Sequence, residues 1–289
     1  MAEYQHNPVL VGEVIEYLQL KQGGHYLDCT CGGGGHSWAI LQARADVNLT
    51  LIDRDAEAIQ ASAQRLQVYG DRIRFWRGNF SEYVPDRAFD GILADLGVSS
   101  YQLDCPDRGF SFRSSGSLDM RMDQSQPLTA GHIVNQWQEQ ALADLIYQYG
   151  EERLSRRIAR AIVRHRPLQT TTELAELIWQ SVPPSYRYGS IHPATRTFQA
   201  LRIAVNRELE SLQAFLAKAP DWLQPKGRIA VISFHSLEDR MVKQAWRHDP
   251  RLLMVTKKPI APSPAEAQQN PRARCAKLRV AEKISPDYA

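Results

Sequence analysis

The chain has 289 residues, of which 43% are hydrophobic and 23% are charged. This composition supports a hydrophobic core and excludes a wholly disordered chain, and the length predicts one large domain with an insertion, or two domains. The net charge of +3, from 35 basic and 32 acidic residues, is too small to identify a partner by itself.

Neither a secretory signal nor a membrane helix is indicated. The N-terminus lacks a basic segment followed by an apolar run, and no stretch approaches the ~18 apolar residues of a membrane helix. The cysteines, at positions 29, 31, 105 and 275, form no Cys-x-x-Cys pair. We therefore expect a cytoplasmic protein with reduced thiols, no metal site and no membrane partner.

Strands and helices alternate over the first ~100 residues. The apolar pattern predicts strands at 26–31, 48–52, 73–76 and 89–94, with helices over 36–45 and 56–66 between them. Such alternation favours an α/β fold with a mostly parallel sheet and right-handed crossovers.

The alternation stops in the middle of the chain. A turn-rich stretch at 104–127 is followed by helical patterns over 138–149, 151–166 and 172–180. We predict an all-helical insertion at 105–197 that interrupts one domain, whose two parts are 1–104 and 198–289.

The last part of the chain returns to the alternating pattern. We expect one long helix over 195–216, a buried strand at 227–234 and a helix over 237–246. A final antiparallel pair at 252–257 and 277–282 is joined by a loop rich in proline, alanine and glutamine, which we expect to be mobile.

A glycine cluster follows the first predicted strand, in the stretch Asp28-Cys-Thr-Cys-Gly-Gly-Gly-Gly-His36. Glycines between a strand and a helix let the backbone approach a ligand, and the helix N-terminus offers unpaired N–H groups. Asp53 ends the second strand, 21 residues after Gly32, where a carboxylate can accept both hydroxyls of a ribose. The bland interpretation is a tight turn and a helix N-cap; the two features together favour an adenosine-containing ligand.

The nature of that ligand is left open by these features. A dinucleotide motif, Gly-x-Gly-x-x-Gly, would need a third glycine where Ser37 or Trp38 stands, so a dehydrogenase is disfavoured. Asp95 ends the fourth strand, and the ends of strands one and four flank the usual ligand crevice of an open α/β sheet. We therefore expect Asp28, Asp95 and the glycine loop to converge.

A series of short motifs runs along nearly the whole chain. In chain order they are His6-Asn-Pro-Val-Leu10, Thr30-Cys-Gly-Gly-Gly-Gly-His-Ser37, Ile52-Asp-Arg-Asp55, Asp95-Leu-Gly-Val-Ser-Ser-Tyr-Gln-Leu-Asp104, Arg108-Gly-Phe-Ser-Phe112, Leu118-Asp-Met-Arg-Met-Asp123, Tyr149-Gly-Glu-Glu-Arg153, His192-Pro-Ala-Thr-Arg-Thr-Phe-Gln-Ala200, Ser233-Phe-His-Ser-Leu-Glu-Asp-Arg240 and Asn270-Pro-Arg-Ala-Arg274. Together they resemble the motifs of the MraW family of 16S rRNA cytosine-N4 methyltransferases.

The resemblance implies a class I S-adenosylmethionine-dependent methyltransferase fold, Rossmann-like, with an inserted helical domain. It implies methyl transfer from S-adenosylmethionine to N4 of cytosine 1402 in 16S rRNA of the small ribosomal subunit. The oligomeric state, monomer or dimer, is not fixed by the sequence. Carried over by motif, the cofactor-binding residues would be Gly34, Gly35, His36, Asp53, Phe80, Asp95 and Gln102. Cys31 and Tyr101 depart from the family pattern, where an aromatic residue and a proline are common, and this puts only loop detail in doubt.

Cytosine chemistry assigns roles near Asp95. The N4 lone pair is delocalised into the ring, so an acceptor at Asp95 would hold the amine in line with the methyl–sulfur bond. His235 is a second polar candidate, and its alternative interpretation is a structural hydrogen bond. A base in folded rRNA must also be turned out into the pocket, and Tyr101, Phe110 and Phe112 are candidates for closing over it.

Basic residues predict where RNA would bind, which gives the insertion at 105–197 an RNA-recognition role and leaves 1–104 and 198–289 as the two parts of the catalytic domain. Arginines recur at helical spacing over 151–166, so that all five lie on one predicted face: Arg153, Arg156, Arg157, Arg160 and Arg164. A solvated face is the bland interpretation, and phosphate contact is the functional one. A second basic cluster lies near the C-terminus, at Arg272, Arg274, Lys277, Arg279 and Lys283.

Three alternatives to an rRNA methyltransferase remain open from the residues. A DNA or protein methyltransferase would use the same scaffold. An RNA-binding assembly factor that only senses the cofactor would keep the glycine loop without turnover. A dehydrogenase would bind NADH instead.

Overall fold

The computed structural model describes residues 8–285, so His6 and Asn7 of the N-terminal motif lie outside the described residues. The chain forms two compact units. The first unit carries the sheet and consists of two stretches of chain, one that ends at Gly97 and one that begins at Leu209. The second unit is the continuous segment Val98–Glu208. Among the described residues, no helix is both long enough and apolar enough to cross a bilayer.

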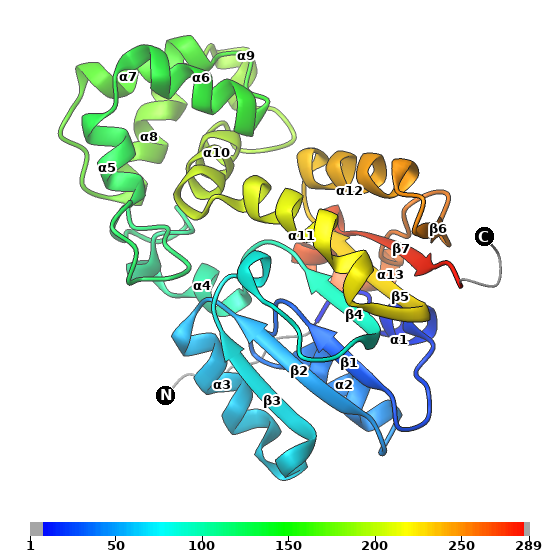
Figure 1. The fold of residues 1–289 in the computed structure, drawn as a ribbon. Helices are drawn as coiled ribbons and strands as arrows, with labels where there is room; N and C mark the ends of the chain where they lie inside the picture. Colours follow the sequence, from blue (N-terminus) through cyan, green and yellow to red (C-terminus); the bar gives the residue numbers. More distant parts are fainter. Residues whose placement is uncertain (1–7, 286–289) are drawn as a thin grey trace. The chain divides into compact units, whose positions relative to one another are not determined.

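A seven-stranded sheet organises the first unit (Figure 1). Its strand order is β3-β2-β1-β4-β5-β7-β6, in which β7 runs antiparallel to β5 and β6 and the other pairs are parallel. The predicted parallel strands and the final antiparallel pair are thus confirmed. The strands are β1 His25–Asp28, β2 Asn48–Asp53, β3 Ile73–Arg77, β4 Phe89–Asp95, β5 Leu223–Ser233, β6 Leu252–Met254 and β7 Lys277–Lys283.

Helices cover both faces of this sheet. Successive residues of β4 point to opposite faces, because side chains alternate along a strand. Leu93 lies in the core formed with α1 Val11–Leu18, α2 Gly35–Ala43 and α3 Ala56–Leu66. Ile92 and Ala94 lie in the core formed with α11 Glu208–Trp222 and α12 Ser236–His248. The central strands are therefore buried on both faces, as expected for a parallel sheet.

Short helices fill the remaining connections of the first unit. Two are 3₁₀ helices at Gln67–Arg72 and Phe80–Glu82. The loop expected to be mobile between β6 and β7 contains α13 Pro264–Gln269 and a 3₁₀ turn, Pro271–Cys275. Ser263 caps α13 by accepting a hydrogen bond from the amide of Glu266, so this connection has a defined structure.

The second unit consists of helices and loops around its own core (Figure 1). Its helices are α4 Ser100–Asp104, a 3₁₀ turn Pro106–Arg108, α5 Ala130–Gln136, α6 Glu139–Gly150, α7 Ser155–Arg164, α8 Thr171–Ser181, α9 Pro184–Arg187 and α10 Ala194–Asn206. The second unit includes more residues than the insertion predicted at 105–197. At its C-terminal end the unit extends to Glu208, because α10 packs against α5, α6 and α8 through residues such as Leu201 and Val205.

Two predicted helix boundaries are wrong for a common reason. The single helix expected over 195–216 is two helices, because Arg207 has a left-handed conformation with φ 50°. The helix expected from 151 begins only at Ser155, because Glu151 has φ 49° and ends α6. Neither site carries a glycine, the residue that normally marks a left-handed helix end.

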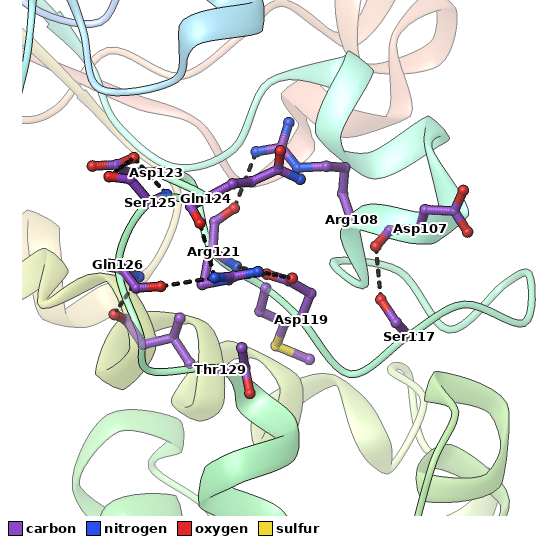
Figure 2. Close-up of polar contacts among 12 residues, drawn as sticks. Asp107, Arg108, Ser117, Asp119, Arg121, Asp123, Gln124, Ser125, Gln126 and Thr129 are labelled. Atoms are coloured by element: carbon purple, nitrogen blue, oxygen red, sulfur yellow. Dashed lines mark hydrogen bonds and ion pairs between the residues drawn. The ribbon is translucent and has the colours of Figure 1, made fainter.

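The long loop between the 3₁₀ turn and α5 is held by two arginines (Figure 2). Arg121 makes a bidentate ion pair with Asp119, with its Nε 2.9 Å from Oδ1 and its Nη2 2.7 Å from Oδ2, and donates to the carbonyls of Gln124 and Gln126. Arg108 is buried and donates to the carbonyls of Arg121 and Met122, each at 3.0 Å. Polar side chains thus order a segment that has no regular secondary structure.

Candidate active site

The glycine loop is fixed to the strands on both sides of β1. The amide of Cys29 donates to Leu93 O on β4 at 2.8 Å, and the amide of Cys31 donates to Ile52 O on β2 at 2.9 Å. Between them, the Thr30 hydroxyl accepts from the amide of Asp95 at 2.7 Å. The loop therefore bridges the carboxyl ends of β2 and β4, where ligands of such sheets bind.

A left-handed glycine starts the helix after the loop. Gly34 is the N-cap of α2 with φ 74°, and a Cβ there would lie 3.2 Å from both Ser62 Cβ and Leu66 Cδ1. No side chain of the described residues caps α2, so its first amides can receive a negative or polar ligand end. Gly34 and Gly35, predicted to bind cofactor, thus lie at a helix N-terminus suited to it.

Asp53 lies at the end of β2 against the loop. Its Oδ2 accepts from the amide of Gly32 and its Oδ1 accepts from the amide of Asp55, each at 2.9 Å. Each carboxylate oxygen retains a lone pair that can accept a ribose hydroxyl. Burial raises the pKa of Asp53 to about 6, and the two amide hydrogen bonds oppose that rise.

Asp28 is a second buried carboxyl, at the end of β1. It is 1% exposed and accepts from the Ser37 hydroxyl at 2.6 Å and from the amide of Thr30 at 3.2 Å. Burial raises its pKa to about 6. The sequence placed Asp28 near the site, but its contact with Ser37 requires the fold of α2 against β1.

Asp95 is the third carboxyl and ends β4. Its Oδ1 is buried and has no hydrogen-bond partner among the described residues, and its Oδ2 lies 3.5 Å from Nδ1 of His36. Burial raises the pKa of Asp95 well above its ordinary value, and the charges of Asp28 and Glu238 add to the effect.

His36 is neutral and cannot balance a charge on Asp95. Its Nε2 lies 2.8 Å from the carbonyl of Val9, which can only accept, so Nε2 carries the proton and Nδ1 does not. Burial lowers the pKa of His36 to about 4, although the bond to Val9 opposes this. These three carboxyls have raised pKa values, and no lysine or arginine within residues 8–285 pairs with them, which favours a positively charged ligand.

The other predicted site residues are more dispersed. Phe80 follows β3, is half-buried and packs edge-on against Phe215 with ring centroids 5.2 Å apart. His235 is the N-cap of α12, where its Nδ1 accepts from the amide of Glu238 at 3.4 Å, which gives it a structural role. Gln102 lies in the helical unit, where its side chain completes a capping box with Ser99.

The three aromatic residues expected to close over a flipped base differ in their exposure. Phe110 is 8% exposed and belongs to the core of the helical unit. Phe112 is half-buried and packs against Phe198 with ring centroids 4.8 Å apart. Tyr101 alone of the three is exposed, so it is the strongest of the three candidates for covering a base.

The five arginines predicted to bind RNA are all exposed, but only four of them lie on α7, because Arg153 precedes that helix. Arg157 donates to the carbonyl of Ser181, and Arg160 lies 3.4 Å from Glu139. Arg156 and Arg164 have no partner in the part of the chain that is described. The α7 face therefore keeps guanidinium groups free for an anionic partner.

Several residues of the second basic cluster, near the C-terminus, are paired with other groups of the protein. Arg279 on β7 is buried with its Nε 2.6 Å from Asp239, and Lys277 lies 3.3 Å from the same carboxylate. Lys283 donates to the carbonyl of Leu223 at 2.7 Å. These three residues anchor β7, so this cluster is a weaker candidate for RNA contact than the α7 face.

The sheet order, with β7 inserted antiparallel between β5 and β6, defines a class I methyltransferase fold. S-adenosylmethionine is the cofactor expected of such a methylase, and the site fits it. The α2 amides suit its carboxylate, Asp53 suits its ribose, and the buried carboxyls suit its positive charge.

Comparison with known proteins identifies the family. A model of the MraW methylase family matches residues 3–284, and the chain belongs to that family. It is 61% identical over 284 residues to ribosomal RNA small subunit methyltransferase H of Rippkaea orientalis, covering 98% of this chain and 93% of the relative. It is 59% identical over 287 residues to the protein of the same name from Synechococcus elongatus, covering 99% and 97%. The solved structure of an rRNA methylase from Streptococcus thermophilus is less similar, with 11% identity, a TM-score of 0.46 and 97% and 100% coverage, and adds nothing to this assignment.

Proposed function

We propose that this chain transfers a methyl group from S-adenosylmethionine to N4 of cytosine 1402 in 16S rRNA, acting on the small ribosomal subunit in the cytoplasm. The observation that carries the proposal is the buried Oδ1 of Asp95, which has no partner among the described residues and lies at the end of β4 beside the glycine loop. Relatives at about 60% identity carry the name of a small-subunit rRNA methyltransferase.

Asp95 would act on the amine of the cytosine. When bound, the cofactor supplies an electrophilic methyl group on a sulfonium. Oδ1 of Asp95 accepts a hydrogen bond from the N4 amine, which localises the nitrogen lone pair toward the methyl carbon. As the N–C bond forms, the nitrogen releases one proton, and the raised pKa of Asp95 makes it a suitable acceptor.

The surrounding residues define the position of Asp95. The Thr30 hydroxyl accepts from the Asp95 amide, and the unprotonated Nδ1 of His36 lies 3.5 Å from Oδ2, so that Oδ1 is the oxygen left for substrate. Asp28 and Asp53 add negative charge near the cofactor site, which favours the sulfonium form of the ligand over its neutral product.

The α7 face would hold the RNA while a base is turned out of its stack. Guanidinium groups pair well with phosphate oxygens, and such contacts fix register without reading sequence. Reversing Arg156, Arg157 and Arg160 to Glu should weaken binding of rRNA and flatten its salt dependence by about two to three charges, with cofactor affinity unchanged. Arg74→Glu with Arg87→Glu, in the sheet unit, is the matched control. An unchanged salt slope would remove the α7 face from the proposal.

Methyl transfer by Asp95→Asn tests the central claim. On purified small subunits with labelled S-adenosylmethionine, we expect a loss of about 10²–10⁴-fold in rate, since the proton acceptor is gone, with cofactor affinity within a few-fold of the parent. Asp86→Asn, an exposed carboxylate before β4, should leave the rate unchanged. Full activity in Asp95→Asn would refute the role of Asp95.

The substrate is tested by varying the acceptor. Small subunits, free 16S rRNA, DNA and protein are each offered with labelled cofactor, and the product nucleoside is mapped by mass spectrometry. Incorporation at N4 of cytosine 1402 supports the proposal. Transfer to DNA or protein, or cofactor binding with no transfer at all, supports one of the alternatives instead.

A further inference from the structure

The helical unit contains a pocket that the methyl-transfer site does not use. It has a volume of about 380 Å³, and its lining includes Arg153, Tyr186, Ser190, His192 and Arg196. Two of the motifs that carry the family resemblance, 149–153 and 192–200, meet there although they are far apart in sequence. The size is within the range of small-molecule sites.

Arg153 is an oriented cation with free donors. It is exposed, and no carboxylate in residues 8–285 pairs with it. Its Cζ lies 5.3 Å from the ring centroid of Tyr186, so a cation–π contact holds the guanidinium in position while its N–H groups remain available.

A buried carboxylate in turn positions the ring of Tyr186. The Tyr186 hydroxyl donates to Oε2 of Glu152 at 2.6 Å, and Oε1 of Glu152 accepts from the amide of Leu154 at 2.8 Å. Glu152 is fully buried, so this bond cannot rearrange without exposing or stranding a charge. The ring that contacts the guanidinium of Arg153 is therefore held in one position by a buried hydrogen bond.

Arg196 brings a second cation to the same pocket. Its Nη1 lies 3.9 Å from Oε2 of Glu152 and 3.4 Å from the carbonyl of Glu151. Desolvation lowers the pKa of His192, so its imidazole is neutral near pH 7 and adds no charge. Two arginines and one glutamate therefore give the residues that line the pocket a net charge of +1.

We infer that this pocket binds a phosphate group, held by Arg153 and Arg196 and reached by the hydroxyl of Ser190. Planar guanidinium forks match phosphate oxygens, and the net positive lining excludes cationic ligands. The inference that the phosphate comes from the RNA backbone rests on the proposed function, because a 16S rRNA substrate presents one phosphate per nucleotide. A free phosphorylated small molecule has the same chemistry and is the other source.

Arg153→Gln tests the pocket in the intact chain. Binding of an oligoribonucleotide matching the region around cytosine 1402 is measured by fluorescence anisotropy at several salt concentrations. We expect about tenfold weaker binding and a salt slope smaller by about one charge. Arg187→Gln is the matched control, because Arg187 also stacks on an aromatic ring, 4.3 Å from that of Trp179, but does not line the pocket. A thermal melt of each variant excludes unfolding as the cause.

Two further measurements separate the possible outcomes. In steady-state methylation of small subunits, Arg153→Gln should raise KM for the subunit without lowering kcat, and should leave cofactor affinity unchanged. If inorganic phosphate binds the parent chain and not Arg153→Gln, while RNA binding is equal in the two, the phosphate site stands and its source is a small molecule. Equal RNA and phosphate binding in both chains overturns the inference. Absence of any methyl transfer by the parent chain overturns the proposed function instead.

Discussion

Asp28→Asn provides a quantitative test of the buried acidic site. Asp28 is 1% exposed, and its pKa rises from 3.8 to about 6 on folding. Below about pH 3 the group is protonated in both states. As the pH rises toward 6 only the unfolded chain loses the proton, so stability falls, and above about 6 the loss is complete. A rise of about two units corresponds to about 3 kcal/mol, of which about 2 kcal/mol falls between pH 4.5 and 7.5.

The variant should remove this dependence without breaking the local structure. The carbonyl oxygen of the substituted side chain would still accept from the Thr30 amide, and the Ser37 hydroxyl can rotate to accept from its NH₂ group. In the chain without cofactor, we therefore expect Asp28→Asn to gain about 2 kcal/mol relative to the parent between pH 4.5 and 7.5.

Hydrogen exchange of peptides from β1 and β4, followed across urea concentrations, measures the sheet unit separately from the helical one. All other titrating groups are shared by the two proteins, so the difference reports Asp28 together with the rise that its charge adds to the pKa values of Asp53 and Asp95. A difference in unfolding free energy that is flat with pH would refute the assignment of a buried, uncompensated carboxyl.

Three further outcomes are expected. Gly34→Ala should lower cofactor affinity at least tenfold and cost about 1–2 kcal/mol of stability, because φ is 74° and the methyl group would press on Ser62 and Leu66. Gly12→Ala is the control, because a Cβ at Gly12 has no atom within 4 Å. Equal cofactor affinities of the two variants in calorimetric titrations would contradict the expectation. Cofactor affinity should rise as the pH increases through about 6, since ionisation of Asp28 and Asp53 attracts a cationic ligand, and a pH-independent Kd from calorimetry at pH 5–8 would speak against it. Asn206→Ala should destabilise the helical unit by about 2–4 kcal/mol in thermal unfolding, because its buried amide joins α10 to Met120 and Met122; a change below 1 kcal/mol would count against that role.

Local sequence signals predicted much of the sheet unit. Strands β2 and β4 were predictable because buried apolar runs end at Asp53 and Asp95, and α3 was predicted with its observed bounds, 56–66. The first strand was predicted at 26–31, but β1 ends at Asp28, because Cys29 to Cys31 already belong to the loop that joins β1 to α2. The helix α13 was missed although its signal was present, since Ser263, Pro264 and Glu266 form a capping sequence before a short helix. A composition rich in proline, alanine and glutamine does not by itself distinguish a loop from a short capped helix.

Tertiary contacts determine what the sequence did not predict. The left-handed residues Glu151 and Arg207 carry no local mark, because neither is the glycine that normally occupies such a helix end. The bond from Thr30 to the Asp95 amide joins residues 65 positions apart. Likewise, the pocket beside Arg153 exists only once the segments around Glu152 and Arg196 meet, and no spacing rule along one segment predicts that.

The chain order of the two units has a consequence for synthesis on the ribosome. Val98–Glu208 is one uninterrupted stretch with its own core, so it can fold as soon as it has emerged. The sheet unit cannot complete its fold at that stage, because β5 and β7 are made after the helical unit. Strand β7 must then pair with both β5 and β6. Until β5 is made, β4 presents an unpaired hydrogen-bonding edge, and a nascent chain that stalls at this stage would be open to aggregation or chaperone capture.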